Sequence, residues 1–96
     1  MDKKIHLNIL YDYYGELFTD KQKSYFESYY FNDLSLSEIA ENNKVSRNAV
    51  HSQIKIVEEK LEFYEKTLRL NEKNKRIREI ISNLDENVKG KIEELL

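Results

Sequence analysis

The chain contains no cysteine, proline or tryptophan, and only Gly15 and Gly90 are glycine. Without cysteine it cannot form a disulfide scaffold, a thiolate zinc site or an iron–sulfur cluster. Folds built from short strands need frequent turn residues, so the scarcity of glycine and proline argues against a sandwich or a barrel. These absences predict an all-α fold.

Long apolar segments are also missing, since no run exceeds three residues. The sequence therefore predicts no membrane-spanning helix and no membrane partner. The segment Met1-Asp2-Lys3-Lys4 leads into mixed polar residues rather than a signal-peptide core, so we expect a cytoplasmic protein. Phe, Tyr, Ile, Asn and Lys, which have A/T-rich codons, are abundant and indicate a low-GC bacterial genome.

The 96 residues predict a single domain over residues 1–96, and 35% of them are charged. A net charge of −2 argues against a protein that coats nucleic acid by bulk charge. The charge is uneven, because residues 66–78 contain one acid, Glu72, among six basic residues. Those six are Lys66, Arg69, Lys73, Lys75, Arg76 and Arg78. Any polyanion is therefore expected to meet the second half of the chain, with Lys66, Arg69, Lys73 and Arg76 among the contacts. The alternative is that the stretch 66–78 is only a solvated helix face.

Apolar spacing divides the chain into about six helices. The first begins near Ile5 and is interrupted near Gly15. Thr19 and Gln22 form a capping box that opens the second helix. Its four aromatic residues lie at helical spacing and are expected to be core rather than a base-stacking platform. They are Tyr25, Phe26, Tyr29 and Tyr30.

The stretch 36–54 predicts a helix-turn-helix. Ser35 and Glu38 form a second capping box that opens a short helix, and Ser46 caps the helix after the turn. Ala40 is small where the two helices cross. Asn43 is expected to take the left-handed conformation of the turn, which asparagine tolerates next best after glycine.

Val45, Val50 and Ile54 are expected to hold the turn and the second helix on the core, which leaves an outward polar face. Ser46 and Arg47, at the start of the helix, are placed to meet phosphate. Other polar residues could reach base edges or the backbone. The candidate nucleic-acid-binding residues of this helix are Ser46, Arg47, Asn48, His51, Ser52 and Lys55.

The second helix of the motif is expected to be long, reaching about Leu70. Apolar residues recur on it at heptad spacing over 50–68, a seam that packs either on the chain's own helices or on a second copy. Residues 71–96 are expected to form a helical C-terminal extension, with a joint at 71–76 and Asp85 capping a last helix.

Enzymatic chemistry is not expected. His6 and His51 are the only histidines and have no pair of acidic ligands at metal spacing. Two isolated glycines cannot build a phosphate-binding loop. The sequence therefore predicts no catalytic residue, no metal or other cofactor, and no small-molecule substrate.

Three segments together resemble the YlxM-type family of small bacterial proteins associated with the signal recognition particle. They are LYDYYGELFTDKQ at 10–22, YYFNDLSLSEIAE at 29–41 and VSRNAV at 45–50, extended by residues 54–68. The family's core is similar to the fourth region of sigma factors, within the winged-helix-like superfamily. The family usually has glycine in the turn where this chain has Asn43, and tyrosine or a similar residue in place of His51.

The resemblance implies a non-enzymatic accessory or regulatory protein of the signal recognition particle pathway. Three modes of action stay open: contact with the particle's RNA or with DNA through the helix-turn-helix; docking on the particle's GTPase or self-association through the 50–68 seam; and regulation of transcription by DNA binding.

Overall fold

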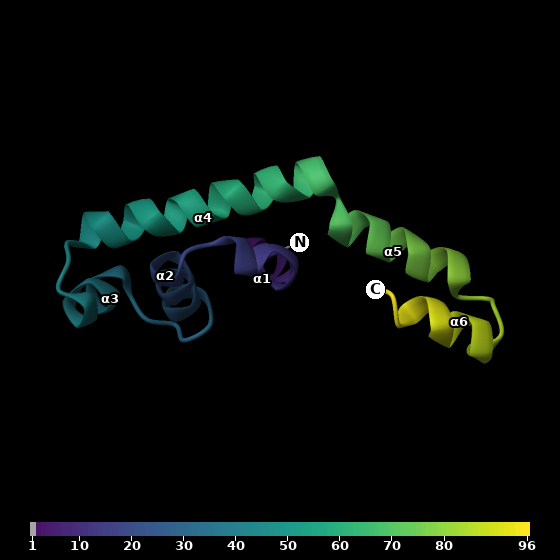
Figure 1. Ribbon diagram of the computed structural model, residues 1–96. Helices are drawn as coiled ribbons and strands as arrows, with labels where there is room; N and C mark the ends of the chain where they lie inside the picture. The colour runs from purple at the N-terminus through teal and green to yellow at the C-terminus, as the bar shows by residue number, and fades with distance from the viewer. Residues whose placement is uncertain (1) are drawn as a thin grey trace.

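The computed structural model describes residues 2–96, and that part of the chain is built of helices, with no strand (Figure 1). The all-α prediction is confirmed. The six α-helices and one short 3-10 helix are α1 (Lys3–Tyr14), η1 (Gly15–Leu17), α2 (Asp20–Tyr30), α3 (Leu36–Asn43), α4 (Arg47–Leu68), α5 (Leu70–Ile81) and α6 (Glu86–Glu93).

Helix boundaries follow the predicted caps. Thr19 accepts from the Gln22 N–H at 3.1 Å, and the Gln22 side chain accepts in return from the Thr19 N–H. Ser35 and Glu38 make the same reciprocal pair at the start of α3. The backbone N–H of Ser35 holds the pKa of the Glu38 carboxyl below its usual range. Both capping boxes are thus confirmed.

The core lies between α4 and the three helices beneath it, α1, α2 and α3 (Figure 1). Aromatic rings fill much of it; Tyr11 stacks on Phe26 with ring centroids 4.5 Å apart. Of the four aromatics predicted on α2, three are buried, whereas Tyr29 is 37% exposed at the edge. The buried set is Leu7, Leu10, Tyr11, Tyr14, Phe18, Tyr25, Phe26, Tyr30, Ile39, Ala40, Val50, Ile54, Val57 and Leu61.

The heptad seam of α4 packs on the chain's own helices. Val50, Ile54, Val57 and Leu61 are each at most 3% exposed, because α1, α2 and α3 cover them. This part of the seam is therefore not available to a second copy. Leu68, the last seam residue, is 43% exposed, beyond the end of the core.

The turn of the helix-turn-helix differs from the expectation in one residue. Lys44, not Asn43, has the left-handed conformation, with φ 56°. Asn43 is instead the last residue of α3, and its side-chain Nδ2 donates to the Ile39 carbonyl at 2.8 Å. The chain thus has a lysine at its left-handed position, where only glycine would avoid the steric penalty of this conformation.

Beyond Leu68 the chain forms an arm, which we define as residues 69–96. The break between α4 and α5 is at Arg69, whose φ is 57°. The joint predicted at 71–76 is wrong, because those residues lie within α5. Asp85 caps α6 as predicted, accepting from the N–H groups of Asn87 and Val88.

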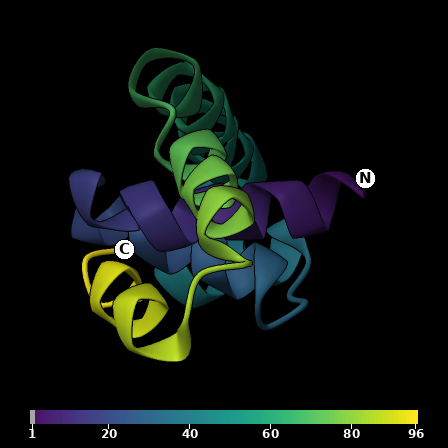
Figure 2. The same cartoon turned by 90° about the vertical axis from the view of Figure 1, so that its right-hand side faces the viewer.

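The arm makes the molecule elongated. Its extents are 54 × 24 × 24 Å and its radius of gyration is 16.9 Å, against about 12 Å for a compact chain of this length. Figure 2, seen along the long axis, shows α5 and α6 standing in front of the core rather than within it. Over the described residues, no helix is long and apolar enough to cross a membrane.

Candidate nucleic-acid interface

The helix-turn-helix consists of α3, the turn around Lys44, and the first turns of α4 (Figure 1). Ser46 caps α4 by accepting from the Ala49 N–H at 3.0 Å. The N–H groups of Arg47 and Asn48 come next to this cap, at the positive end of the helix dipole. The long helix therefore begins at the surface with backbone donors and a basic side chain together.

The first turns of α4 divide into a buried and an outward face, as the sequence predicts. Val50 and Ile54 are buried, and Val45 packs against the core. All six predicted residues of this face are exposed, and none of them has a salt-bridge partner among the described residues. They are Ser46, Arg47, Asn48, His51, Ser52 and Lys55. The structure thus brings these six side chains onto one end of one helix.

A hollow of about 200 Å³ lies beside this face, between α4, the end of α2 and the start of α1. His51 and Lys55 line it together with Lys3 and Tyr29. An open hollow of about 500 Å³ adjoins it, and the two share Lys3, Tyr29 and Tyr30. Sequence reasoning missed Lys3 and Tyr29, because nothing in the local pattern shows that the start of α1 folds beside α4.

Glu58 also lines this hollow, and its carboxylate has two partners. Glu58 accepts from the Tyr30 hydroxyl, and its Oε1 is 3.6 Å from the Lys3 ammonium. Burial and the neighbouring carboxylate raise the pKa of Tyr30, so the tyrosine stays a neutral donor. Glu58 is thereby paired with Tyr30 and Lys3, whereas Lys55, which also lines the hollow, has no salt-bridge partner among the described residues.

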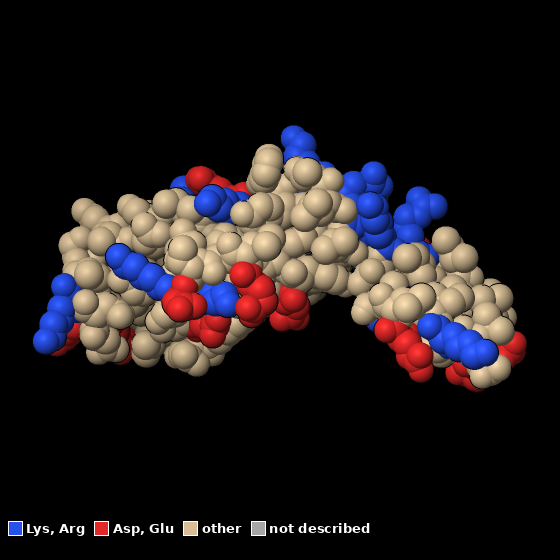
Figure 3. Space-filling view, in the orientation of Figure 1, with Lys and Arg blue, Asp and Glu red and all other residues tan. Residues whose placement is uncertain are grey.

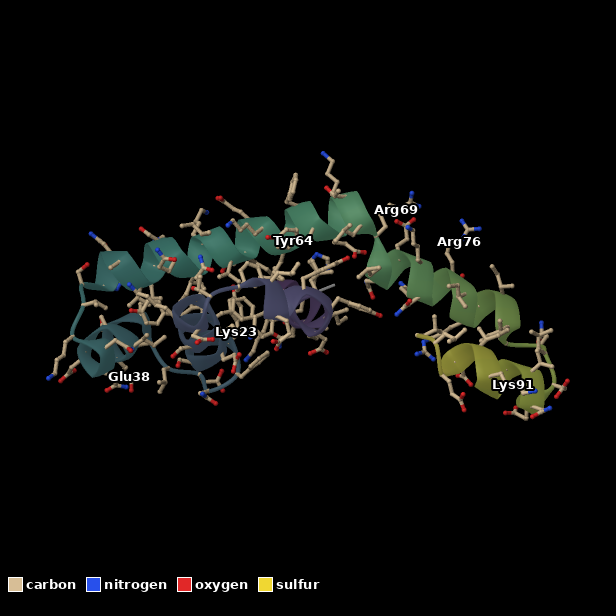
Figure 4. All side chains as sticks on the ribbon, in the orientation of Figure 1. Lys23, Glu38, Tyr64, Arg69, Arg76 and Lys91 are labelled. Carbon is tan, nitrogen blue, oxygen red and sulfur yellow. The ribbon has the colours of Figure 1, made fainter. Side chains whose placement is uncertain are left out.

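The second predicted basic group lies elsewhere on the molecule. Lys66, Arg69, Lys73 and Arg76 are exposed, the first at the end of α4 and the others at the joint and on α5. Lys55 and Lys66, the nearest members of the two groups, are eleven residues apart on α4, about 17 Å at the helical rise. In Figures 3 and 4 basic side chains of α5 lie along its outer edge, away from α3, whereas Lys91 lies on α6. The structure therefore does not join the two groups into one patch.

Arg69 is also not free to meet a phosphate. Its Nε and guanidinium NH2 donate to the two carboxylate oxygens of Glu72, at 3.0 and 3.2 Å. This pairing raises the pKa of Arg69 and lowers the pKa of Glu72. Of the four predicted contacts, Arg69 is thus the one that has a salt-bridge partner among the described residues.

The direction of the arm is set by Glu65 and Tyr14. The Glu65 carboxylate accepts from the Tyr14 hydroxyl at 2.6 Å and from the N–H groups of Asn71 and Glu72 at 3.2 and 3.1 Å. The Tyr14 hydroxyl in turn accepts from the Leu70 N–H at 3.1 Å. The first turn of α5 is therefore capped by groups from α4 and α1, because Arg69 supplies no side-chain cap. Burial and Glu65 raise the pKa of Tyr14 to about 12.

Replacing Glu65 with alanine is expected to loosen this joint. The Tyr14 hydroxyl and the N–H groups of Asn71 and Glu72 lose their acceptor, which costs about 1–3 kcal/mol where such groups are shielded from water. Amide hydrogen exchange measured by NMR should then speed up about tenfold or more at residues 70–73, with the core amides unchanged. Equal exchange at these amides in both proteins would contradict the capping role.

Among the described residues, no three His, Cys, Asp or Glu side chains cluster as metal ligands do. His6 Nε2 lies 2.7 Å from Glu62 on α4, whereas His51 is on the exposed face of the motif. The two histidines therefore lie at different places on the surface and do not form one site.

Comparison with known proteins shows that this chain is similar to one family of bacterial helix-turn-helix proteins. The family model described as "helix-turn-helix protein, YlxM / p13 like" matches residues 1–95. YlxM of Bacillus subtilis is 45% identical over 94 residues, covering 98% of this chain and 86% of that protein. A protein of Thermoanaerobacter sp. is 46% identical, covering 93% of this chain and 74% of the relative, and one of Clostridium perfringens is 42% identical, covering 100% and 95%.

Proposed function

Because this chain belongs to the YlxM / p13-like family of helix-turn-helix proteins, we propose that it is a non-enzymatic accessory or regulatory protein that contacts nucleic acid through this motif. The link to the signal recognition particle rests on the family resemblance. The nucleic acid is the particle's RNA, or DNA in a regulatory role.

One observation supports the binding function above the others: the unpaired, exposed polar face at the start of α4. A helix N-terminus with free N–H groups attracts phosphate, and Arg47 adds a charge at the same place. Asn48 follows Arg47 directly, and His51 and Ser52 lie about one turn further along, where a helix in a groove reaches base edges. Lys55 follows on the same face.

The charge around the motif favours selective over indiscriminate binding. Glu38 and Glu41 are exposed on α3, against Lys44, Arg47 and Lys55 on the turn and α4. The local excess of positive charge is small, and the whole chain is −2. A protein with this charge gains little from the phosphate backbone alone, so base, shape or structural contacts must contribute to useful affinity.

The test is fluorescence anisotropy of labelled signal recognition particle RNA with the purified protein, against a DNA duplex of equal length, at two salt concentrations. We expect one of the two to bind more tightly and to keep that preference at the higher salt. Preference for the RNA supports the accessory role; preference for DNA supports a transcriptional regulator. Equal binding that salt abolishes, or no binding to either, would overturn the proposal and make the particle's GTPase the partner to test.

A further inference from the structure

The arm leaves an unusual amount of apolar surface open. Ile81 is its only buried residue among those described, and α6 has none. Ile80 is 70% exposed and Leu95 is 86% exposed. Leu84 and Val88, at the turn and the start of α6, are 43% and 42% exposed.

These residues follow helical spacing. On α5 and after its end they recur as Ile77, Ile80, Ile81 and Leu84, and on α6 and after its end as Val88, Ile92 and Leu95. Each helix is therefore amphipathic, with an apolar stripe only partly covered by the other helix. Two short helices with one buried side chain cannot hold each other in place, since most helical stability comes from packing an apolar face.

Charge divides between the two helices of the arm. Residues 70–81 contain four basic and two acidic residues, and residues 85–96 contain four acidic and two basic residues. Figure 3 shows basic side chains along the outer edge of α5, and acidic ones around α6 with a basic side chain lying across its face. Arg78 and Glu93 already join the helices within one chain, at 3.3 Å.

We propose that the arm is a dimerisation element, in which the apolar faces of two arms meet around a two-fold axis and form a four-helix bundle. A second copy fits because an isologous interface must be complementary to itself. If the two-fold axis runs parallel to the helices, the basic α5 of each copy packs on the acidic α6 of the other copy. Every pair of neighbouring helices in the bundle is then antiparallel. An axis across the helices would lay basic α5 on basic α5.

This inference does not depend on the proposed function, and its test contains no nucleic acid. Molar mass is measured by light scattering and sedimentation from about 1 to several hundred micromolar. We expect the mass to rise to twice 11.6 kDa with concentration. A mass that stays at one chain throughout this range would overturn the proposal.

Substitutions locate the interface. Ile80→Glu and Val88→Glu, made separately, are expected to raise the dimer dissociation constant at least tenfold. Circular dichroism checks that their core still melts cooperatively. Phe63→Glu is the matched control, because Phe63 is 61% exposed on α4, outside the arm. It should leave the dimer intact, and a dimer lost in Phe63→Glu but kept in the arm variants would place the interface on α4 and refute the assignment.

A charge reversal distinguishes the two axes. In Lys73→Glu/Arg76→Glu, α5 becomes acidic and would face the acidic α6 of the other copy, so we expect weaker dimerisation. If α5 lay on α5, the substitution would only exchange one like-charge pair for another and leave the dissociation constant unchanged. That result would overturn the proposed arrangement.

Discussion

Leu61→Asp should abolish cooperative folding. Leu61 has no exposed surface and belongs to the hydrophobic core between α4 and the helices beneath it. Truncating a buried leucine costs about 2–5 kcal/mol, and a carboxylate without a partner in the same place adds a desolvation penalty. Together these approach the whole stability of a small domain, about 5–15 kcal/mol. Thermal melts followed by circular dichroism should show little or no unfolding transition at neutral pH.

Phe63→Asp is the control for this variant, because Phe63 is two residues away on the same helix and 61% exposed. It should melt close to wild type. In any folded molecules of Leu61→Asp, burial raises the pKa of the introduced carboxyl, so the folded state binds the proton more tightly than the unfolded state does. Lowering the pH towards 4 should therefore recover part of the fold relative to wild type at the same pH. A cooperative melt of Leu61→Asp at neutral pH would contradict the assigned core.

Arg47→Ala/Lys55→Ala should weaken nucleic-acid binding without affecting the fold. Both side chains are exposed and neither pairs with an acid. Each lost phosphate contact lowers the salt dependence of binding by about one unit of slope, and a lost arginine contact costs about 1–3 kcal/mol. We expect at least a tenfold loss of affinity in anisotropy titrations, and a shallower dependence on salt.

Lys89→Ala/Lys91→Ala removes the same net charge from α6 and is the matched control. It should retain most of the affinity, because α6 lies at the opposite end of the molecule from α3 (Figure 1). If both double variants lost affinity equally, binding would depend on net charge and the interface would not be the start of α4. A loss confined to substitutions in 69–76 would move the interface to the arm.

Local chemistry made much of this fold predictable from sequence. Thr19, Ser35, Ser46 and Asp85 cap helices by reaching N–H groups two or three residues away, so the information lies within one turn. The buried face of α4 follows from spacing alone, because every fourth or third residue returns to the same side of a helix. The same spacing places Arg47 and Lys55 on the opposite, exposed side of α4.

Other features join residues that are distant in the sequence and could not be predicted from it. The sequence predicts that α4 ends near Leu70, but not the direction in which α5 continues; that direction is held in part by Tyr14, 56 residues away from Leu70. Tyr29 occupies the same stripe as its buried neighbours and is exposed only because no helix covers its edge of α2.

The helices, their caps and the outward face of the motif were thus already specified by the order of the amino acids, since each depends on neighbours within a few residues. Two further outcomes came from the packing of the whole chain: α1, α2 and α3 cover most of the heptad seam, and the arm keeps its apolar face open. Those outcomes depend on which helices pack against each other in the folded chain. The spacing of apolar residues predicts which face of a helix is apolar, but not which other helix covers it.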